Sequence, residues 1–330
     1  MHEDAHRFPA QVYEIACKIR EMKIRGAGRI AKAAAEALGV AAEDYKGEDL
    51  EDFKMYMVNV SKLLTSTRPT AVSLPNAVSW VLKPLSSPDI SSVQEAKAAV
   101  KSRAKAFVHY ADQALRKIAE FGEKLLTDGD TVLTHCNSLA AISVIVEAFR
   151  MGKNIQVFVT ETRPKYQGYI TSEMLLKEGL RIRLIPETSV RYLMKRVDKV
   201  VVGADTVAAN GAVVNKIGTS LIALAAHEKA VDFFVATETF KFSPYTFIGD
   251  IVPIEFRPPS EIVSEEFLKM HPRLKVLNPA FDVTPPDFIS GIITELGIIP
   301  PKSAAIIIEE IYGRPVISME SPRGVEEDTS

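Results

Sequence analysis

Beyond Asp128, short runs of β-branched and apolar residues alternate with helical patterns, and this alternation limits the possible folds more than any other feature. The strand-like runs are 131–135, 155–161, 181–186, 199–205 and 232–238, and 251–256 is expected to add a further strand. Helical patterns follow at 138–149, 170–180, 189–197 and 219–230. Strands that alternate with helices predict βαβ units, and therefore a parallel sheet covered by helices on both faces.

The part of the chain before Asp128 has a different pattern. Apolar residues recur at helical spacing over 12–22, 50–64 and 93–126, and the composition of 83–92 is that of a loop. No strong strand pattern interrupts these helices. The predicted fold is therefore α/β, with a smaller all-helical domain at 1–127 followed by a Rossmann-like parallel-sheet domain at 128–330.

Charge and cysteine content exclude several classes of protein. The formal net charge is −2, so no overall field attracts nucleic acid or an anionic membrane, and no apolar stretch is long enough to cross a bilayer. The charged N-terminus does not resemble a signal peptide. The two cysteines, Cys17 and Cys136, are far apart and match no zinc spacing, and Cys17 is expected in a helical core. These features predict a cytoplasmic protein without disulfides.

Residues 26–31, GAGRIA, match the glycine pattern of a dinucleotide-binding turn. That turn requires a preceding strand and a surrounding βαβ unit. Gly26 and Gly28 instead follow a helical pattern, so a nicotinamide site is not predicted. A simple helix–turn–helix junction explains the glycines but does not explain why Arg25 and Arg29 flank them.

Chemically active side chains follow the predicted strands. Cys136 follows the first strand, Arg163 the second, Asp205 the fourth and Lys241 the fifth. Because ligands bind beyond the carboxyl ends of parallel strands, we expect a thiol, a carboxylate and two cations at one edge of the sheet. Each has a simpler explanation, since a single cysteine is usually a small apolar residue and an aspartate at a strand end is often a cap.

The stretch NKIGT (215–219) leads directly into an apolar helix. Its backbone N–H groups and the ammonium group of Lys216 are expected to point at an anion. A capped helix with a surface lysine is the alternative.

Six motifs carry a family resemblance: RGAGRIA (25–31), RPTAV (68–72), THCNS (134–138), ETRP (161–164), GADTVAANGAVVNKIGT (203–219) and FKFSP (240–244). In this order they resemble the superfamily of sugar-phosphate aldose–ketose isomerases and the regulatory subunits of the translation-initiation guanine-nucleotide exchange factor. The resemblance extends from about residue 20 to residue 310.

Differences between the branches imply an activity. The regulatory subunits generally lack the cysteine and typically have glutamate where this chain has Asp205, so Cys136 and Asp205 favour an enzyme. Methylthioribose-1-phosphate isomerases usually have Arg-Gly-Ala-Pro, whereas residues 25–28 here are Arg-Gly-Ala-Gly. The chain looks more like the archaeal ribose 1,5-bisphosphate isomerases, which form ribulose 1,5-bisphosphate in AMP and nucleotide salvage. The methylthioribose isomerase and the non-catalytic subunit remain the alternatives.

The resemblance also implies residue roles. Asp205 is the expected proton donor, with a raised pKa, and Cys136 the expected proton acceptor, with a pKa lowered by cations or by the following helix. A proton shuttled between C2 and C1 is preferred over a hydride shift, without metal or cofactor. The implied substrate contacts are Arg25, Gly26, Ala27, Gly28, Arg68, Ser138, Leu139, Ala140, Asn215, Lys216 and Lys241, with Arg29 and Arg163 as additional phosphate contacts.

The same resemblance implies a homo-oligomer, either a dimer or a trimer of dimers. The expected partner is a small sugar bisphosphate, with neither nucleic acid nor membrane.

Overall fold

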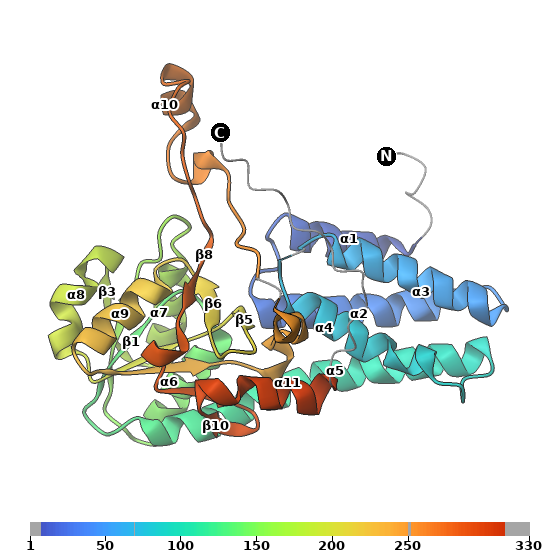
Figure 1. Cartoon of the computed structure of the whole chain (residues 1–330), viewed down its shortest axis with the longest axis horizontal. Coiled ribbons are helices and arrows are strands. Elements are labelled where there is room, and N and C mark those ends of the chain that lie inside the picture. The colour runs from blue at the N-terminus through green and yellow to red at the C-terminus, as the bar shows by residue number, and fades with distance from the viewer. Residues whose placement is uncertain (1–7, 69, 250–251, 314–330) are drawn as a thin grey trace.

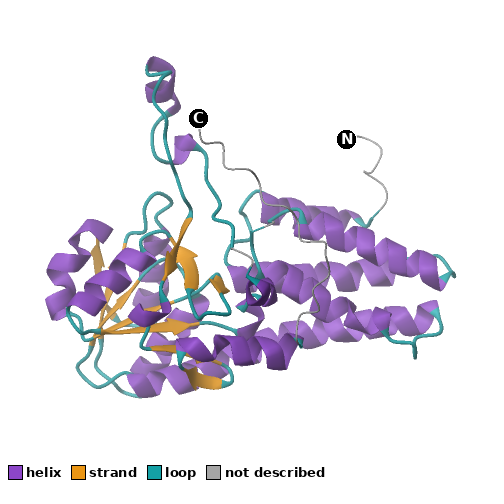
Figure 2. Ribbon diagram, in the orientation of Figure 1, coloured by secondary structure: helices purple, strands orange, loops and turns teal. Residues whose placement is uncertain are grey.

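The N-terminal part of the chain is a helical bundle in the computed structural model, which describes residues 8–68, 70–249 and 252–313. Its α-helices are α1 (Ala10–Arg20), α2 (Ala27–Asp44), α3 (Leu50–Thr65), α4 (Ser73–Leu82) and α5 (Val93–Gly122). Two of them begin at side-chain caps: Asp49 accepts the N–H of Asp52, and Ser92 and Glu95 form a capping box. We call α1–α5 the helical region; it gathers at one end of the molecule (Figure 2).

The alanine-rich helix α2 lies at the centre of this region and packs against α4 and α5. Ala34, Ala35 and Leu38 are fully buried there. Small side chains allow close approach, since a Cβ built on Gly39 would lie 3.2 Å from Cβ of Ala104 in α5. A tight alanine core therefore fixes the position at which α2 begins, and the candidate site depends on that position.

The second part of the chain, the sheet region, contains a seven-stranded sheet within the described residues, in the order β10-β9-β7-β4-β1-β2-β3. Its strands are β1 (Thr131–Thr134), β2 (Gln156–Thr160), β3 (Arg181–Ile185), β4 (Lys199–Val202), β7 (Asp232–Ala236), β9 (Gly291–Thr294) and β10 (Gly297–Ile299). Neighbouring strands are parallel except β9 and β10. The predicted α/β class with a largely parallel sheet is confirmed.

Helices cover both faces of the sheet, and two separate apolar clusters fill the spaces beneath them (Figure 1). These helices are α6 (Leu139–Arg150), α7 (Gln167–Lys177), α8 (Val190–Leu193), α9 (Thr219–Glu228) and α11 (Ala304–Tyr312). The chain runs outward from β1 to β3 and then returns to build β4, β7 and β9 on the other side. The direction of winding therefore reverses between β1 and β4, and such reversals open a ligand crevice.

Several local predictions need correction. Residue 251 of the predicted strand at 251–256 lies outside the described residues. Residues 252–255 have no strand pairing and Phe256 makes a single bridge to Pro279, because Pro253 interrupts the run and has no N–H for a ladder. Residues 83–86 form a short 3-10 helix within the predicted loop. The predicted helix at 189–197 contains only one turn of α-helix, α8, flanked by 3-10 turns. Cys17 is exposed and does not belong to the core.

A second, antiparallel sheet of β5 (Thr206–Val207), β6 (Val213–Lys216) and β8 (Phe281–Thr284) was not predicted. Between β7 and β8 the chain extends away from the body and carries the short helix α10 (Glu265–Met270) at its far end (Figure 1). None of the helices in the described ranges is long and apolar enough to span a membrane.

The segment after β7 ties the two regions together. Phe240 is buried among the side chains of the helical core, and Asn76 of α4 donates to the carbonyls of Phe240 and Phe242, each at 2.9 Å. Helix α5 ends at Gly122 and β1 begins at Thr131. The division into domains at 127/128 stays a prediction.

Candidate active site

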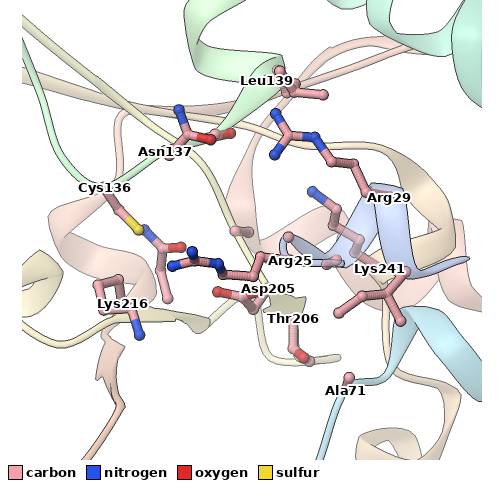
Figure 3. A pocket seen from close by; sticks show the side chains of 18 of the residues that line it. Arg25, Arg29, Ala71, Cys136, Asn137, Leu139, Asp205, Thr206, Lys216 and Lys241 are labelled. Carbon is pink, nitrogen blue, oxygen red and sulfur yellow. The ribbon is translucent and has the colours of Figure 1, made fainter. Parts of the chain in front are cut away.

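A cavity of about 420 Å³ lies between the start of α2 and the carboxyl ends of the sheet strands. Side chains from both regions point into it (Figure 3). It is lined by thirteen residues predicted as catalytic groups or substrate contacts and by one predicted additional contact: Arg25, Gly26, Ala27, Gly28, Arg29, Arg68, Cys136, Ser138, Leu139, Ala140, Asp205, Asn215, Lys216 and Lys241. Arg163 is not among the lining residues. Its exposed guanidinium group lies 5.2 Å from the ring centroid of Tyr166, because the turn into α7 directs it outward.

Cys136 and Asp205 lie just beyond the carboxyl ends of two neighbouring strands. Cys136 follows β1 and Asp205 follows β4, which pairs with β1 across the point where the winding reverses. The backbone N–H of Asp205 donates to the carbonyl of Val214 at 2.9 Å, and this fixes the carboxyl group beside the second sheet. The thiol and the carboxyl group therefore face the same cavity, on the side where Arg25 and Lys216 also lie (Figure 3).

Burial determines the protonation of this pair. Removal from water raises the pKa of the Cys136 thiol to about 11, although the positive charge of Lys216 opposes the increase. The predicted lowering of this pKa is therefore wrong, because desolvation outweighs the neighbouring cation. Burial also raises the pKa of Asp205, against the lowering effect of Lys241 and other cations, and this is the predicted direction.

His135 precedes the thiol and is fully buried. Its Nε2–H donates to the carbonyl of Ile217 at 2.9 Å, and its Nδ1 lies 2.6 Å from Oγ1 of Thr160. Burial lowers the pKa of this imidazole to about 4, so the ring is neutral at physiological pH. The histidine thus joins the end of β1 to the turn that carries Lys216.

The cations of the cavity differ in their surroundings. Arg25 and Arg29 of the helical region are exposed. Arg68 is buried and pairs with Glu255 at 3.0 Å. Lys241 is also buried, and its Nζ lies 2.7 Å from Oε2 of Glu238. The exposure of these cations therefore ranges from the exposed Arg25 and Arg29 to the buried, ion-paired Arg68 and Lys241.

Lys216 is held in a third way, with its Nζ 4.6 Å from the ring centroid of Phe281. Such a cation–π contact orients the ammonium group without neutralising its charge.

The start of α9 corrects the predicted anion site at 215–219. The carboxylate of Asp282 accepts the N–H of Gly218 at 2.7 Å and the N–H of Ser220 at 3.1 Å. These backbone donors are therefore already occupied by a side chain of the protein. Asn215 and Lys216 line the cavity, but these backbone N–H groups are not free to bind an anion there. Nδ2 of Asn215 donates to Oγ1 of Thr219.

The start of α6 opens on the same cavity. Ser138 caps this helix, because its Oγ accepts the N–H of Ala141 at 3.3 Å, and Leu139 and Ala140 line the cavity at its first turn. A helix N-terminus favours a negative charge. A Cβ on Gly203 would lie 2.2 Å from Oγ of Ser138, so glycine at this position allows β4 to approach the capped helix.

The glycine turn lies on the opposite side of the cavity. Gly26 has a φ of 89°, a conformation that favours glycine, and it precedes the first residue of α2. A Cβ on Gly28 would lie 2.9 Å from Oε1 of Glu238, so the missing side chain makes room for this carboxylate.

Some residues at the cavity were not selected from the sequence. Glu238 and Asn137 line it, and Glu255 pairs with Arg68. Glu238 and Asn137 follow predicted strands, so their positions in the sequence could have indicated that they line the cavity. Glu255 carried no such signal, since its contact joins residues 187 positions apart.

Within the described ranges, no group of three or more His, Cys, Asp or Glu side chains is placed to hold a metal ion. The absence of a metal or cofactor from the reaction stays a prediction.

Comparison with known proteins identifies the class. Residues 23–301 match the model of the Initiation factor 2 subunit family, and the chain belongs to that family. Among its relatives, the ribose 1,5-bisphosphate isomerase of Archaeoglobus fulgidus is 51% identical over 303 residues, covering 92% of this chain and 94% of the relative. The ribose 1,5-bisphosphate isomerase of Thermococcus kodakarensis is 47% identical over 306 residues, covering 92% and 95%.

A solved structure has the same fold. The 5-methylthioribose 1-phosphate isomerase of Pyrococcus horikoshii superposes with a TM-score of 0.76 at 31% identity, covering 91% of this chain and 88% of that protein. The predicted superfamily, which joins sugar-phosphate isomerases to initiation-factor subunits, is confirmed by these comparisons.

Proposed function

We propose that this protein is an aldose–ketose isomerase that converts ribose 1,5-bisphosphate to ribulose 1,5-bisphosphate in the salvage of nucleotides such as AMP. The observation that carries the proposal is the thiol of Cys136 and the carboxyl group of Asp205 on one cavity, at the winding reversal of the sheet. The relatives named ribose 1,5-bisphosphate isomerase support the choice of substrate. Neither a regulatory subunit nor a simple binding protein requires such a pair.

The chemistry of the substrate requires two groups. A phosphate on the anomeric carbon prevents spontaneous ring opening, so the ring oxygen must be protonated and a proton must then leave C2 and reach C1. In our proposal Asp205 donates a proton to the ring oxygen, and Cys136 accepts the proton from C2 and returns it to C1. The proton released from the 2-hydroxyl group, as the C2 ketone forms, restores the acid form of Asp205. Placement of an acid and a base on either side of one sugar is the usual arrangement for general acid–base catalysis.

The raised pKa values indicate how the pair shares its protons. In the free protein the charge of Asp205 helps to keep the thiol protonated, and Lys216 favours the thiolate. Protonation of Asp205 removes the repulsion and allows the thiolate to form beside Lys216. We therefore propose that the active form carries a single proton on the pair, and that before ring opening this proton resides on Asp205 while Cys136 is a thiolate.

The two phosphates require cations and backbone donors. We propose that they bind Arg25, Arg29, Arg68, Lys216 and Lys241, the backbone of Gly26, Ala27 and Gly28, the side chain of Asn215, and the start of α6 at Ser138, Leu139 and Ala140. Arg163 is left out of this set because it lies outside the cavity.

A homo-oligomer, either a dimer or a trimer of dimers, and a cytoplasmic location are also proposed. Analytical ultracentrifugation tests the oligomeric state. The cytoplasmic location is proposed because the substrate is a sugar bisphosphate released from nucleotides.

The decisive experiment compares two sugars. Purified protein is assayed for kcat/KM on ribose 1,5-bisphosphate and on methylthioribose 1-phosphate, with Cys136→Ser as the paired variant. We expect the bisphosphate to be preferred and the variant to lose turnover. Preference for methylthioribose 1-phosphate would assign the activity of the Pyrococcus horikoshii neighbour. No turnover of either sugar would leave the regulatory subunit as the remaining hypothesis.

A further inference from the structure

Cys136 has a backbone conformation that is unusual for a side chain with a Cβ. Its φ is 65°, in the left-handed region, which residues other than glycine adopt rarely and at an energetic cost. The β1 ladder ends at Thr134, so no neighbouring strand supplies hydrogen bonds at this position. Other contacts must therefore hold this residue in place.

Thr162 supplies the first contact. Its Oγ1 accepts the backbone N–H of Cys136 at 3.0 Å, from the turn that follows β2. Thr162 is fully buried and is itself left-handed, with a φ of 63°. Its own N–H donates to Oε1 of Glu187, so the turn is fixed from a third segment.

Thr171 supplies the second contact. Its hydroxyl donates to the backbone carbonyl of Cys136 at 2.6 Å and accepts Nδ2–H of Asn137 at 3.0 Å. Thr171 lies in α7 and is fully buried. Both backbone groups of Cys136 are thus bonded to threonine hydroxyls, where an extended strand would bond to its neighbour.

We propose that Thr162 and Thr171 are positioning residues that hold Cys136 in its left-handed conformation and so direct its thiol into the cavity. Neither threonine is among the residues that line the cavity, so both act through Cys136. Replacement by valine keeps the shape but leaves a buried peptide group without its partner. The backbone then relaxes toward the extended conformation, which turns the sulfur away from the substrate. The catalytic consequence rests on the proposed isomerase function.

The kinetic test uses Thr171→Val, Thr171→Ser and a matched control, Thr284→Val. Thr284 is equally buried, and its hydroxyl has no hydrogen-bond partner among the described residues. We expect Thr171→Val to lower kcat on the order of 10-fold to 100-fold with little change in KM. Serine should restore most of kcat, and the control should match the wild type. Equal losses in the serine and valine variants, or an unchanged kcat in Thr171→Val, would overturn the proposal.

A second test does not depend on turnover. In a Cys17→Ser background, iodoacetamide reaches Cys136 through the cavity, and its alkylation rate is followed by mass spectrometry at several pH values. We expect the rate to fall in Thr171→Val and Thr162→Val and to recover in the serine variants. Unchanged rates in both valine variants would refute the positioning role. If Thr171→Val does not fold, Thr162→Val with Thr162→Ser carries both tests.

The two tests also separate the proposals. Wild-type protein that converts no ribose 1,5-bisphosphate would refute the proposed function, while the alkylation rates would still decide whether the threonines direct the thiol.

Discussion

The helical and sheet regions contribute different kinds of chemistry to the same cavity. The sheet region supplies Cys136 and Asp205, both desolvated and both with raised pKa values. The helical region supplies Arg25 and Arg29, which are exposed cations. We propose that Cys136 and Asp205 move protons, and that Arg25 and Arg29 bind phosphate together with the cations and backbone donors of the sheet region.

The largest effect is expected for the proton-transferring pair. Cys136→Ser and Asp205→Asn should each lower kcat on the order of 100-fold to 10,000-fold, because general acid–base catalysis supplies about this much. KM should change little, since the phosphate contacts stay intact. Steady-state kinetics on ribose 1,5-bisphosphate provide the measurement. A large increase in KM with normal kcat would place these residues in binding instead.

Arg25→Ala should show the opposite pattern. Loss of a charged hydrogen-bond donor to phosphate is expected to raise KM about 10-fold to 100-fold, corresponding to about 1.5–3 kcal/mol, with kcat largely retained. Arg163→Ala is the matched control, since that arginine is exposed and lies outside the cavity. Equal effects of the two substitutions on KM would contradict phosphate binding by Arg25.

Burial of His135 at the end of β1 should also make the free energy of unfolding depend on pH. The pKa of His135 falls from 6.5 to about 4 on folding, so between these values the unfolded chain binds a proton that the folded chain excludes. Stability from this residue is therefore complete above pH 6.5 and falls by about 3 kcal/mol as the pH drops to about 4. Urea unfolding of the wild type and of His135→Gln across this range measures the contribution. The same pH slope in both proteins would contradict it.

The smallest effect is expected where the two regions touch. Gly28→Ala places a Cβ against the carboxylate of Glu238 and should disturb its pairing with Lys241. We expect KM to rise up to about fivefold, equivalent to about 1 kcal/mol. An unchanged KM in Gly28→Ala would show that this contact does not influence substrate binding.

Only part of the sheet region could be predicted from the sequence. Strands β1, β2, β3, β4 and β7 were predicted because β-branched runs with flanking helices have few alternatives. The second sheet was missed, because β5 has two residues and β8 pairs with β6 only after a long excursion. The apolar run at 251–256 failed as a strand prediction because composition does not report whether a partner strand is available.

The site shows the same limit. That Cys136 and Asp205 would line one cavity followed from strand ends and family resemblance. The direction of the thiol pKa was predicted incorrectly, because desolvation arises from segments that are distant in the sequence. The capping of α9 by Asp282 was equally inaccessible, since 62 residues separate it from Ser220.

The pH dependence of kcat/KM examines the shared proton. If the active form carries one proton on the pair, kcat/KM should be constant through the mildly alkaline range and fall as the pH approaches about 11, where Cys136 loses its proton in the free enzyme. Cys136→Ser serves as the control, since its residual activity should lack this alkaline limb. An alkaline limb near neutrality in the wild type would require a different base.

Turnover in deuterated water distinguishes proton transfer from hydride transfer, because a proton carried by Cys136 can exchange with solvent whereas a migrating hydride cannot. Ribose 1,5-bisphosphate is converted in D₂O, and the ribulose 1,5-bisphosphate is analysed by mass spectrometry and NMR. We expect solvent deuterium at C1 in a measurable fraction of the product. Product free of solvent deuterium, formed with complete transfer of the original C2 hydrogen to C1, would contradict it.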